Sequence, residues 1–90
     1  MNIQVLTPEE VIFDGEVEAV TVPGIGGEFQ MLNNHAPIVS TLGAGKVKLK
    51  SVISSLEQSQ SISDEGNYKT FTIKGGTLEF SNNQGIILCD

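Results

Sequence analysis

Short stretches in which apolar and polar residues alternate constrain the fold of this chain more than any other feature. The pattern is clear in three of them: residues 46–50, 70–74 and 77–81. Ile3 and Val5 begin a fourth. Successive side chains of a β-strand point to opposite faces, so a period of two predicts strands that bury one face and expose the other.

Two further stretches are apolar without strict alternation. In the stretch 16–22 the apolar positions change phase between Ala19 and Val20. This change indicates either a β-bulge or a strand that is covered on both faces part-way along its length. Residues 86–88 are continuously apolar, which is typical of a short strand buried on both faces.

Turn-forming residues separate these strands at short intervals. They include Asp14-Gly15, Pro23-Gly24, Gly75-Gly76 and Asn82-Asn83. No helical face of useful length is present, and many short strands separated in this way predict an all-β fold, a flattened antiparallel β-sandwich. Ninety residues make one domain, 1–90. Its serine-rich residues 51–67 are predicted to form an extended hairpin loop, in which the flanking strands could continue through Val52, Ile53, Leu56 and Ile62.

The charge of the chain excludes several kinds of partner. Eleven acidic residues against five lysines and no arginine give a formal net charge of -6. Nucleic acids and anionic membrane surfaces would repel such a chain, so neither nucleic-acid binding nor lipid insertion is expected. Lys46, Lys48 and Lys50 stand at strand spacing, and we expect them to form one solvated strand face. Cys89 is the single cysteine, which makes an internal disulfide impossible and favours a reducing compartment.

The sequence offers no motif for catalysis or for binding a cofactor or metal. Gly24 and Gly26 begin a G-x-G-x-x-G pattern, but Phe29 stands at its third glycine position. The only histidine, His35, lies between an Asn pair and Pro37. Its surroundings predict a rigid polar turn, with the imidazole exposed or hydrogen-bonded to backbone. Two other hypotheses stay open: a free-standing β-sandwich module that binds a peptide or small ligand, and a small hydrolase that uses His35.

The order of short motifs along the chain carries a family resemblance. The motifs are Thr7-Pro8-Glu9, Phe13–Val17, Val22-Pro23-Gly24, Gly27-Glu28-Phe29, Asn34–Pro37, Gly45-Lys46-Val47, Gly75–Phe80 and Ile86–Leu88. Together they resemble the N-terminal domain of the epsilon subunit of F-type ATP synthases. The resemblance covers the chain except for residues 51–67, where that family has a short acidic turn.

The resemblance implies a flattened sandwich of about ten strands and a function without chemistry of its own. An epsilon-type domain belongs to the central stalk of the rotary motor, where it couples rotation of the c-ring to the gamma subunit during proton- or sodium-driven ATP synthesis. The implied location is the cytoplasmic face of the bacterial inner membrane, without a cofactor. The C-terminal helical pair that inhibits ATP hydrolysis in many family members, and binds ATP in some, does not fall within residues 1–90.

The resemblance also implies two sets of contact residues. Gly27, Glu28, Phe29, His35, Ala36 and Pro37 match the loops that touch the c-ring. Glu28 and His35 are expected to be its polar contacts, together at one end of the sandwich. The candidates for the contact with the gamma subunit are Thr7, Pro8, Gly75, Gly76, Leu78 and Phe80.

Overall fold

A computed structural model describes all 90 residues and consists of β-strands joined by turns. The all-β prediction is therefore confirmed, with nine strands. They are β1 (Asn2–Leu6), β2 (Val11–Gly24), β3 (Gly27–Leu32), β4 (Ile38–Leu42), β5 (Gly45–Gln58), β6 (Ser63–Glu65), β7 (Tyr68–Ile73), β8 (Gly76–Ser81) and β9 (Gln84–Cys89). No helix long and apolar enough to cross a membrane is found.

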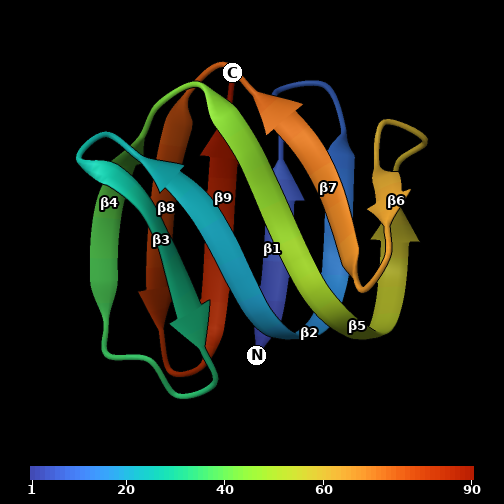
Figure 1. Ribbon diagram of the computed structural model, residues 1–90, viewed down its shortest axis with the longest axis horizontal. Helices are drawn as coiled ribbons and strands as arrows, with labels where there is room; N and C mark the ends of the chain where they lie inside the picture. Colours follow the sequence, from blue (N-terminus) through green and yellow to red (C-terminus); the bar gives the residue numbers. More distant parts are fainter.

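The strands form two packed layers (Figure 1). One layer contains β3, the second half of β2, the first half of β5, and β7 with β6 at its edge. The other contains β4, β8, β9, β1 and the first half of β2. Hydrogen bonding is antiparallel except between β1 and β9, which run parallel with Asn2 beside Gln84. The predicted antiparallel β-sandwich is confirmed, and this parallel pair is its one departure from antiparallel pairing.

The two 14-residue strands β2 and β5 pass from one layer to the other. Their shared register shifts twice, between Asp14 and Gly15 and between Glu16 and Val17. Beyond these bulges, residues 19–22 are all buried. The sequence analysis gave two alternative explanations for the phase change in residues 16–22. Both apply, because a bulge precedes a segment that is covered on both faces.

A single apolar cluster fills the space between the layers. Its 18 buried members come from eight strands and the N-terminal residue: Met1, Ile3, Val5, Ile12, Phe13, Val17, Val20, Val22, Met31, Leu42, Val47, Leu49, Phe71, Ile73, Leu78, Phe80, Ile87 and Cys89. Eight of the 18 are the inward members of the alternating stretches. Burying one such side chain stabilises the fold by about 1.5–3 kcal/mol before entropy costs.

Two sequence-based expectations are wrong in detail. Residues 51–58 continue β5 instead of forming a loop, so the connection to β6 shrinks to residues 59–62. The backbone of this part of β5 is held by pairing with β2. In the run 86–88 only Ile87 is fully buried, while Ile86 and Leu88 point to the open face of the sheet.

The short strand β6 is held by a small polar network. Glu65 accepts a 2.6 Å hydrogen bond from the Thr70 hydroxyl, and its carboxylate lies 3.4 Å from the Lys46 ammonium. The Thr70 hydrogen bond, followed by the contact with Lys46, lowers the pKa of Glu65 below its ordinary value of 4.5. The ionised carboxylate is the form of Glu65 that these contacts favour. They therefore hold β6 most strongly above pH 4.5, and their contribution is lost as the pH falls through the lowered pKa of Glu65.

We predict that Leu78→Ala lowers the free energy of unfolding by about 2–5 kcal/mol, because the 0% exposed side chain leaves a cavity in the core. The neighbouring exposed residue supplies the control: Glu79→Ala should change it by no more than about 0.5 kcal/mol. Urea denaturation followed by circular dichroism measures both. Equal stabilities of the two variants would contradict the inward orientation of Leu78.

We also predict that Thr70→Val raises the titration midpoint of the Glu65 carboxyl toward 4.5, because the variant keeps the shape of the side chain but removes its hydroxyl donor. The exposed Thr72 on the same strand provides the control, since Thr72→Val should leave the midpoint unchanged. A carbon-detected NMR titration reads the carboxyl directly. The same midpoint in all three proteins would show that Thr70 does not hold Glu65.

Candidate interaction surfaces

The loop between β3 and β4, which contains His35, is fixed by backbone hydrogen bonds. Asn34 adopts a left-handed conformation with φ of 64°, which asparagine tolerates better than most residues. Its amide donates to the Asn83 side chain at 2.8 Å, and the His35 amide donates to the Leu32 carbonyl at 3.1 Å. Asn33 accepts a hydrogen bond from the amino group of Met1. The loop is therefore closed by one local bond and tied to two other parts of the chain, the N-terminus and the β8–β9 turn.

The imidazole of His35 is half-buried and already engaged. Its Nδ1–H donates to the Ala36 carbonyl at 2.7 Å. The ring meets Phe80 edge-to-face, with centroids 6.1 Å apart and an interplanar angle of 83°. Nowhere in the chain do three His, Cys, Asp or Glu side chains group closely enough to hold a metal ion. This arrangement suits a positioned surface contact with Nε2 as its remaining polar atom.

The turn between β2 and β3 is the second rigid tip. Its Ile25 amide donates to the Thr41 carbonyl at 3.1 Å, and the Gly43 amide donates to the Pro23 carbonyl at 2.8 Å. Glu28, just beyond the turn, is exposed and lies 3.5 Å from the Lys48 ammonium. Its carboxylate is therefore presented at the surface beside a cation from β5.

Glu28 and His35 do not lie at one end of the sandwich, contrary to the sequence-based expectation. Glu28 is near the start of β3 and His35 follows its end, and six residues of strand span roughly 17 Å. Figure 1 shows the two connections at opposite ends of β3. β3 pairs only with β2, so its other edge has no strand partner. A single surface that includes both residues must run along this free edge.

The predicted residues of the β3 region differ in what they offer to a partner. Gly27, Ala36 and Pro37 are exposed, as is Glu28. The Phe29 side chain instead packs against the core. It therefore supports β3 from within and is not available as a full surface contact.

The predicted gamma-facing residues on β8 need a larger correction. Leu78 and Phe80 are 0% and 2% exposed, so their side chains belong to the core. Gly75 is also buried. At Gly76 a Cβ atom would come within 2.2 Å of the Leu88 carbonyl oxygen, so glycine is required there by the close approach of β9. Core packing and the close approach of two strands therefore explain the residue types at these positions without a contact to a partner.

Thr7 and Pro8 lie at one end of an exposed face that the sequence did not reveal. Together with Leu6 and Gly76 they line an open depression that ends at Leu88. This depression lies beside the outer face of β9. Both residues are therefore accessible from that face.

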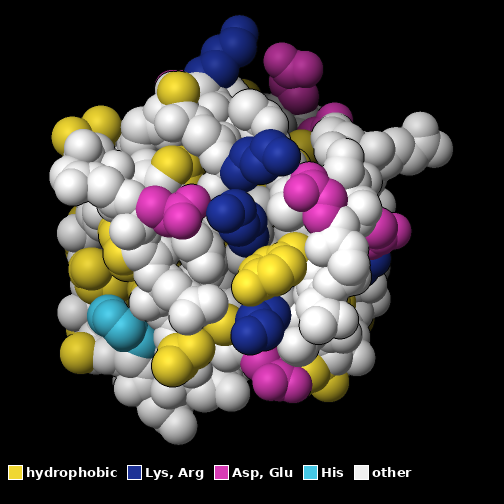
Figure 2. Space-filling view, in the orientation of Figure 1, with side chains coloured by type: hydrophobic (Ala, Val, Ile, Leu, Met, Phe, Trp, Pro, Cys, Tyr) yellow, Lys and Arg dark blue, Asp and Glu magenta, His cyan; other side chains and the backbone are white.

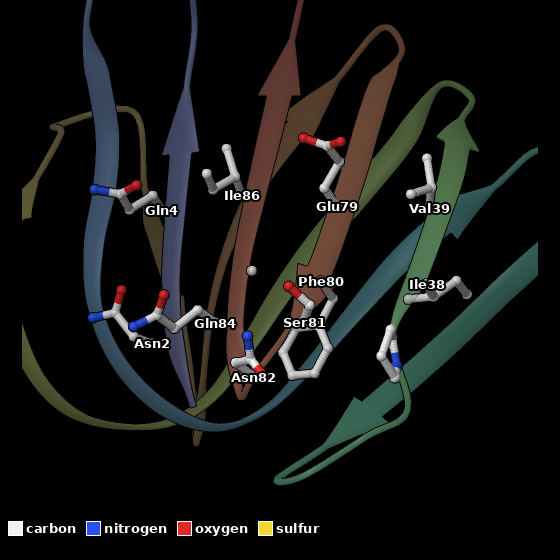
Figure 3. Close-up of a pocket in the computed structure, with 12 residues that line it drawn as sticks. Asn2, Gln4, Ile38, Val39, Glu79, Phe80, Ser81, Asn82, Gln84 and Ile86 are labelled. Atoms are coloured by element: carbon white, nitrogen blue, oxygen red, sulfur yellow. The ribbon is translucent and has the colours of Figure 1, made fainter.

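The outer face of β1, β9, β8 and β4 carries exposed apolar side chains. Val39 is 74% exposed and Leu88 48%, and Ile86 lies beside them in the sheet. A shallow hollow of about 500 Å³ crosses these strands, and Figure 3 shows Gln4, Ile86 and Val39 along it. In the sequence only the apolar run 86–88 pointed to this part of the sheet, and it predicted a strand that is buried on both faces.

The face of the other layer is polar. Its lysines run in a row with acidic side chains on both sides (Figure 2). Lys46 pairs with Glu65 and Lys48 with Glu28. This confirms the predicted solvated lysine face, and the ion pairs leave little net charge on the middle of the sheet.

Comparison with solved structures supports the sandwich fold. The central stalk and c-ring structure of the Tetrahymena thermophila mitochondrial ATP synthase contains a chain similar over 99% of this one and 62% of its own length, with a TM-score of 0.67 and 17% identity. A chain in the OSCP/F1/c-ring structure from Euglena gracilis is similar over 97% of this chain and 48% of its own length, with a TM-score of 0.73 and 20% identity.

Sequence comparison is more specific. The ATP synthase epsilon chain of Chlorobaculum tepidum is 38% identical over 89 residues, which are 99% of this chain and 88% of that protein. The epsilon chain of Leptospira borgpetersenii is 34% identical over 90 residues, covering all of this chain and 61% of that protein. The family model described as "ATP synthase, Delta/Epsilon chain, beta-sandwich domain" matches residues 1–90. The chain therefore belongs to the epsilon family of ATP synthase subunits.

Proposed function

We propose that this chain is a non-catalytic subunit of the central stalk of an F-type ATP synthase, where it helps to couple rotation of the c-ring to the gamma subunit. The family match over residues 1–90 carries the proposal. The implied location is peripheral, on the cytoplasmic face of a bacterial membrane. The relatives from Chlorobaculum tepidum and Chlorobium limicola, which are bacterial epsilon chains matched over most of their length, support this placement.

A role without chemistry fits the surroundings of the one histidine. His35 Nδ1 is used by a backbone carbonyl, and the ring rests on Phe80. No hydroxyl or thiol forms a hydrogen bond with the imidazole, although a nucleophile must lie within hydrogen-bond reach of its base. The geometry is better suited to holding a contact loop than to activating a nucleophile.

The contact with the c-ring would lie along the free edge of β3. Glu28 and His35 mark the two ends of this edge, and the exposed Gly27, Ala36 and Pro37 extend it. Both end loops are fixed by cross-loop hydrogen bonds. A rigid edge transmits torque with little loss of orientation, whereas a flexible one would let the ring slip beneath it.

The gamma subunit would bind the outer face of β1, β9, β8 and β4. Its exposed Val39, Ile86 and Leu88 provide apolar area next to the amides of Asn2 and Gln4. Glu79 lies between Val39 and Ile86 in the register of β4, β8 and β9, so a partner that covers this face would need apolar groups together with a cation. Thr7, Pro8 and Gly76 would form the border of this contact surface. Leu78, Phe80 and Gly75 are buried and would support the surface without touching the gamma subunit.

We predict that the double variant Glu28→Ala/His35→Ala, combined with a two-residue insertion between Gly26 and Gly27, weakens coupling without unfolding the domain. Exposed polar contacts contribute about 0–1 kcal/mol each, so neither single substitution should uncouple the motor. ATP-driven proton pumping by reconstituted vesicles measures coupling, and thermal melting of the isolated chain measures folding. Glu9→Ala, at an exposed acid outside this edge, is the control.

Two outcomes would contradict the proposed ring contact. Normal pumping by the combined variant would show that the β3 edge does not touch the ring. A large drop in melting temperature with either single substitution would show that Glu28 or His35 acts on folding instead.

We predict that Val39→Asp/Ile86→Asp lowers the affinity for the gamma subunit at least about tenfold, since burying two carboxylates in an apolar contact is unfavourable. Binding of the chain to purified gamma by calorimetry gives the measurement. Ile25→Asp provides a matched control, because Ile25 is an exposed aliphatic residue on the β2–β3 turn. Equal affinities of both variants would remove this face from consideration.

A further inference from the structure

The second part of β5, residues 51–58, carries two exposed apolar side chains that the core does not use. In the register with β2, Gly15 lies opposite Ser55 and Val17 opposite Val52, so Leu56 and Ile53 are extra residues at the two bulges. Ile53 is 63% exposed and Leu56 86%. A bulge re-aims the side chains around it, and here it leaves large aliphatic groups in solvent. We call this segment the β5 extension.

Carboxylates surround the β5 extension without a full set of counter-ions. Asp14 and Glu57 are directly opposite on neighbouring strands, where like charges are destabilising. Neither carboxylate forms an ion pair. The paired lysines interact with other acidic residues, and the amino group of Met1 pairs with Glu16. The chain has no lysine before residue 46. Asp14 accepts a 3.3 Å hydrogen bond from the Gln4 side-chain amide, but no cation of the chain pairs with it or with Glu57.

The neighbourhood of the β5 extension restricts what could cover it. β7 pairs only with residues 45–50, so the edge of residues 52–58 is free of a strand partner. The two bulges interrupt that edge, which makes it a poor template for a long added strand. A second copy of this chain would bring the same acids together, and an anionic membrane or nucleic acid would be repelled.

We propose that the β5 extension is a docking strip for a basic, amphipathic segment of a partner protein. Apolar side chains of that segment would cover Ile53 and Leu56, which lie roughly 10 Å apart along the strand. Its lysine or arginine side chains would stand between Asp14 and Glu57 and remove their repulsion. The strip lies on the opposite edge of the domain from β3 (Figure 1), so this contact and the proposed ring contact can exist together.

An NMR titration of the full chain tests the proposal, with a short capped peptide of alternating lysine and leucine as the probe. Backbone shifts are expected to concentrate in residues 13–17 and 52–58. Glu57→Lys and Leu56→Ser should each weaken binding about three- to tenfold, which corresponds to exposed charge pairs or one small apolar contact. Glu79→Lys makes the same charge change on β8, which β2, β1 and β9 separate from the β5 extension, and should not weaken it.

The outcomes separate clearly. Shifts scattered over all acidic surfaces, or an equal loss with Glu79→Lys, would reduce the interaction to general charge attraction and overturn the proposal. The absence of any shift, or equal binding of a glutamate–leucine peptide, would overturn it as well. Because the assay uses neither gamma nor the ring, its failure leaves the proposed rotor function untouched.

Discussion

The pairing of β2 with β5 is the interaction on which the rest of the structure depends. Both strands take part in the two layers, so their hydrogen bonds connect one face of the core to the other. Such a crossing needs a change in strand direction, which the two bulges provide. At the first bulge a Cβ on Gly15 would come within 2.2 Å of the Ser54 carbonyl oxygen. This bend is therefore possible only with glycine, and the layers close over Val20 and Val22 because of it.

The fold leaves three surfaces with different chemistry. The face of β5 and β7 carries ion pairs, the outer face of β8 and β9 carries apolar side chains beside the Glu79 carboxylate, and the free edge of β3 ends in two hydrogen-bonded loops. A subunit that transmits rotation needs more than one firm contact, since a single contact would act as a pivot. Under the proposed function, the separate surfaces of this small sandwich would supply more than one such contact.

Alternation predicted the strands well but not their partners. The stretches 46–50 and 77–81 fall in strands with the inward residues as expected, and so does 70–73, except that Thr70 is buried as well as Phe71. The same alternation already placed Leu78 and Phe80 inside, which conflicts with the gamma contact that the family resemblance implied for them. A period of two carries no information on which strand lies next to which, so the parallel pair β1–β9 could not be foreseen.

Two kinds of residue misled the sequence-based prediction for physical reasons. Ile86 and Leu88 are apolar but exposed, because alternate residues of β9 face away from the core and apolar side chains are also common on protein surfaces. In residues 51–58 the bulges put Ile53 and Leu56 out of phase, which hid the strand behind a loop-like pattern. The distance between Glu28 and His35 depends on the length of β3, and the order of motifs along the sequence does not give the length of a strand.

The parallel pairing of β1 with β9 affects how the domain folds. β1 is held between β2 and β9, so the first strand to be synthesised gains its second neighbour only when the last one has emerged from the ribosome. Until then Ile3 and Val5 have only part of their core around them. Non-local pairing of this kind is slow to form. The sheet therefore stays open between β1 and β8 until β9 pairs with both, which makes this pairing one of the late steps expected in folding.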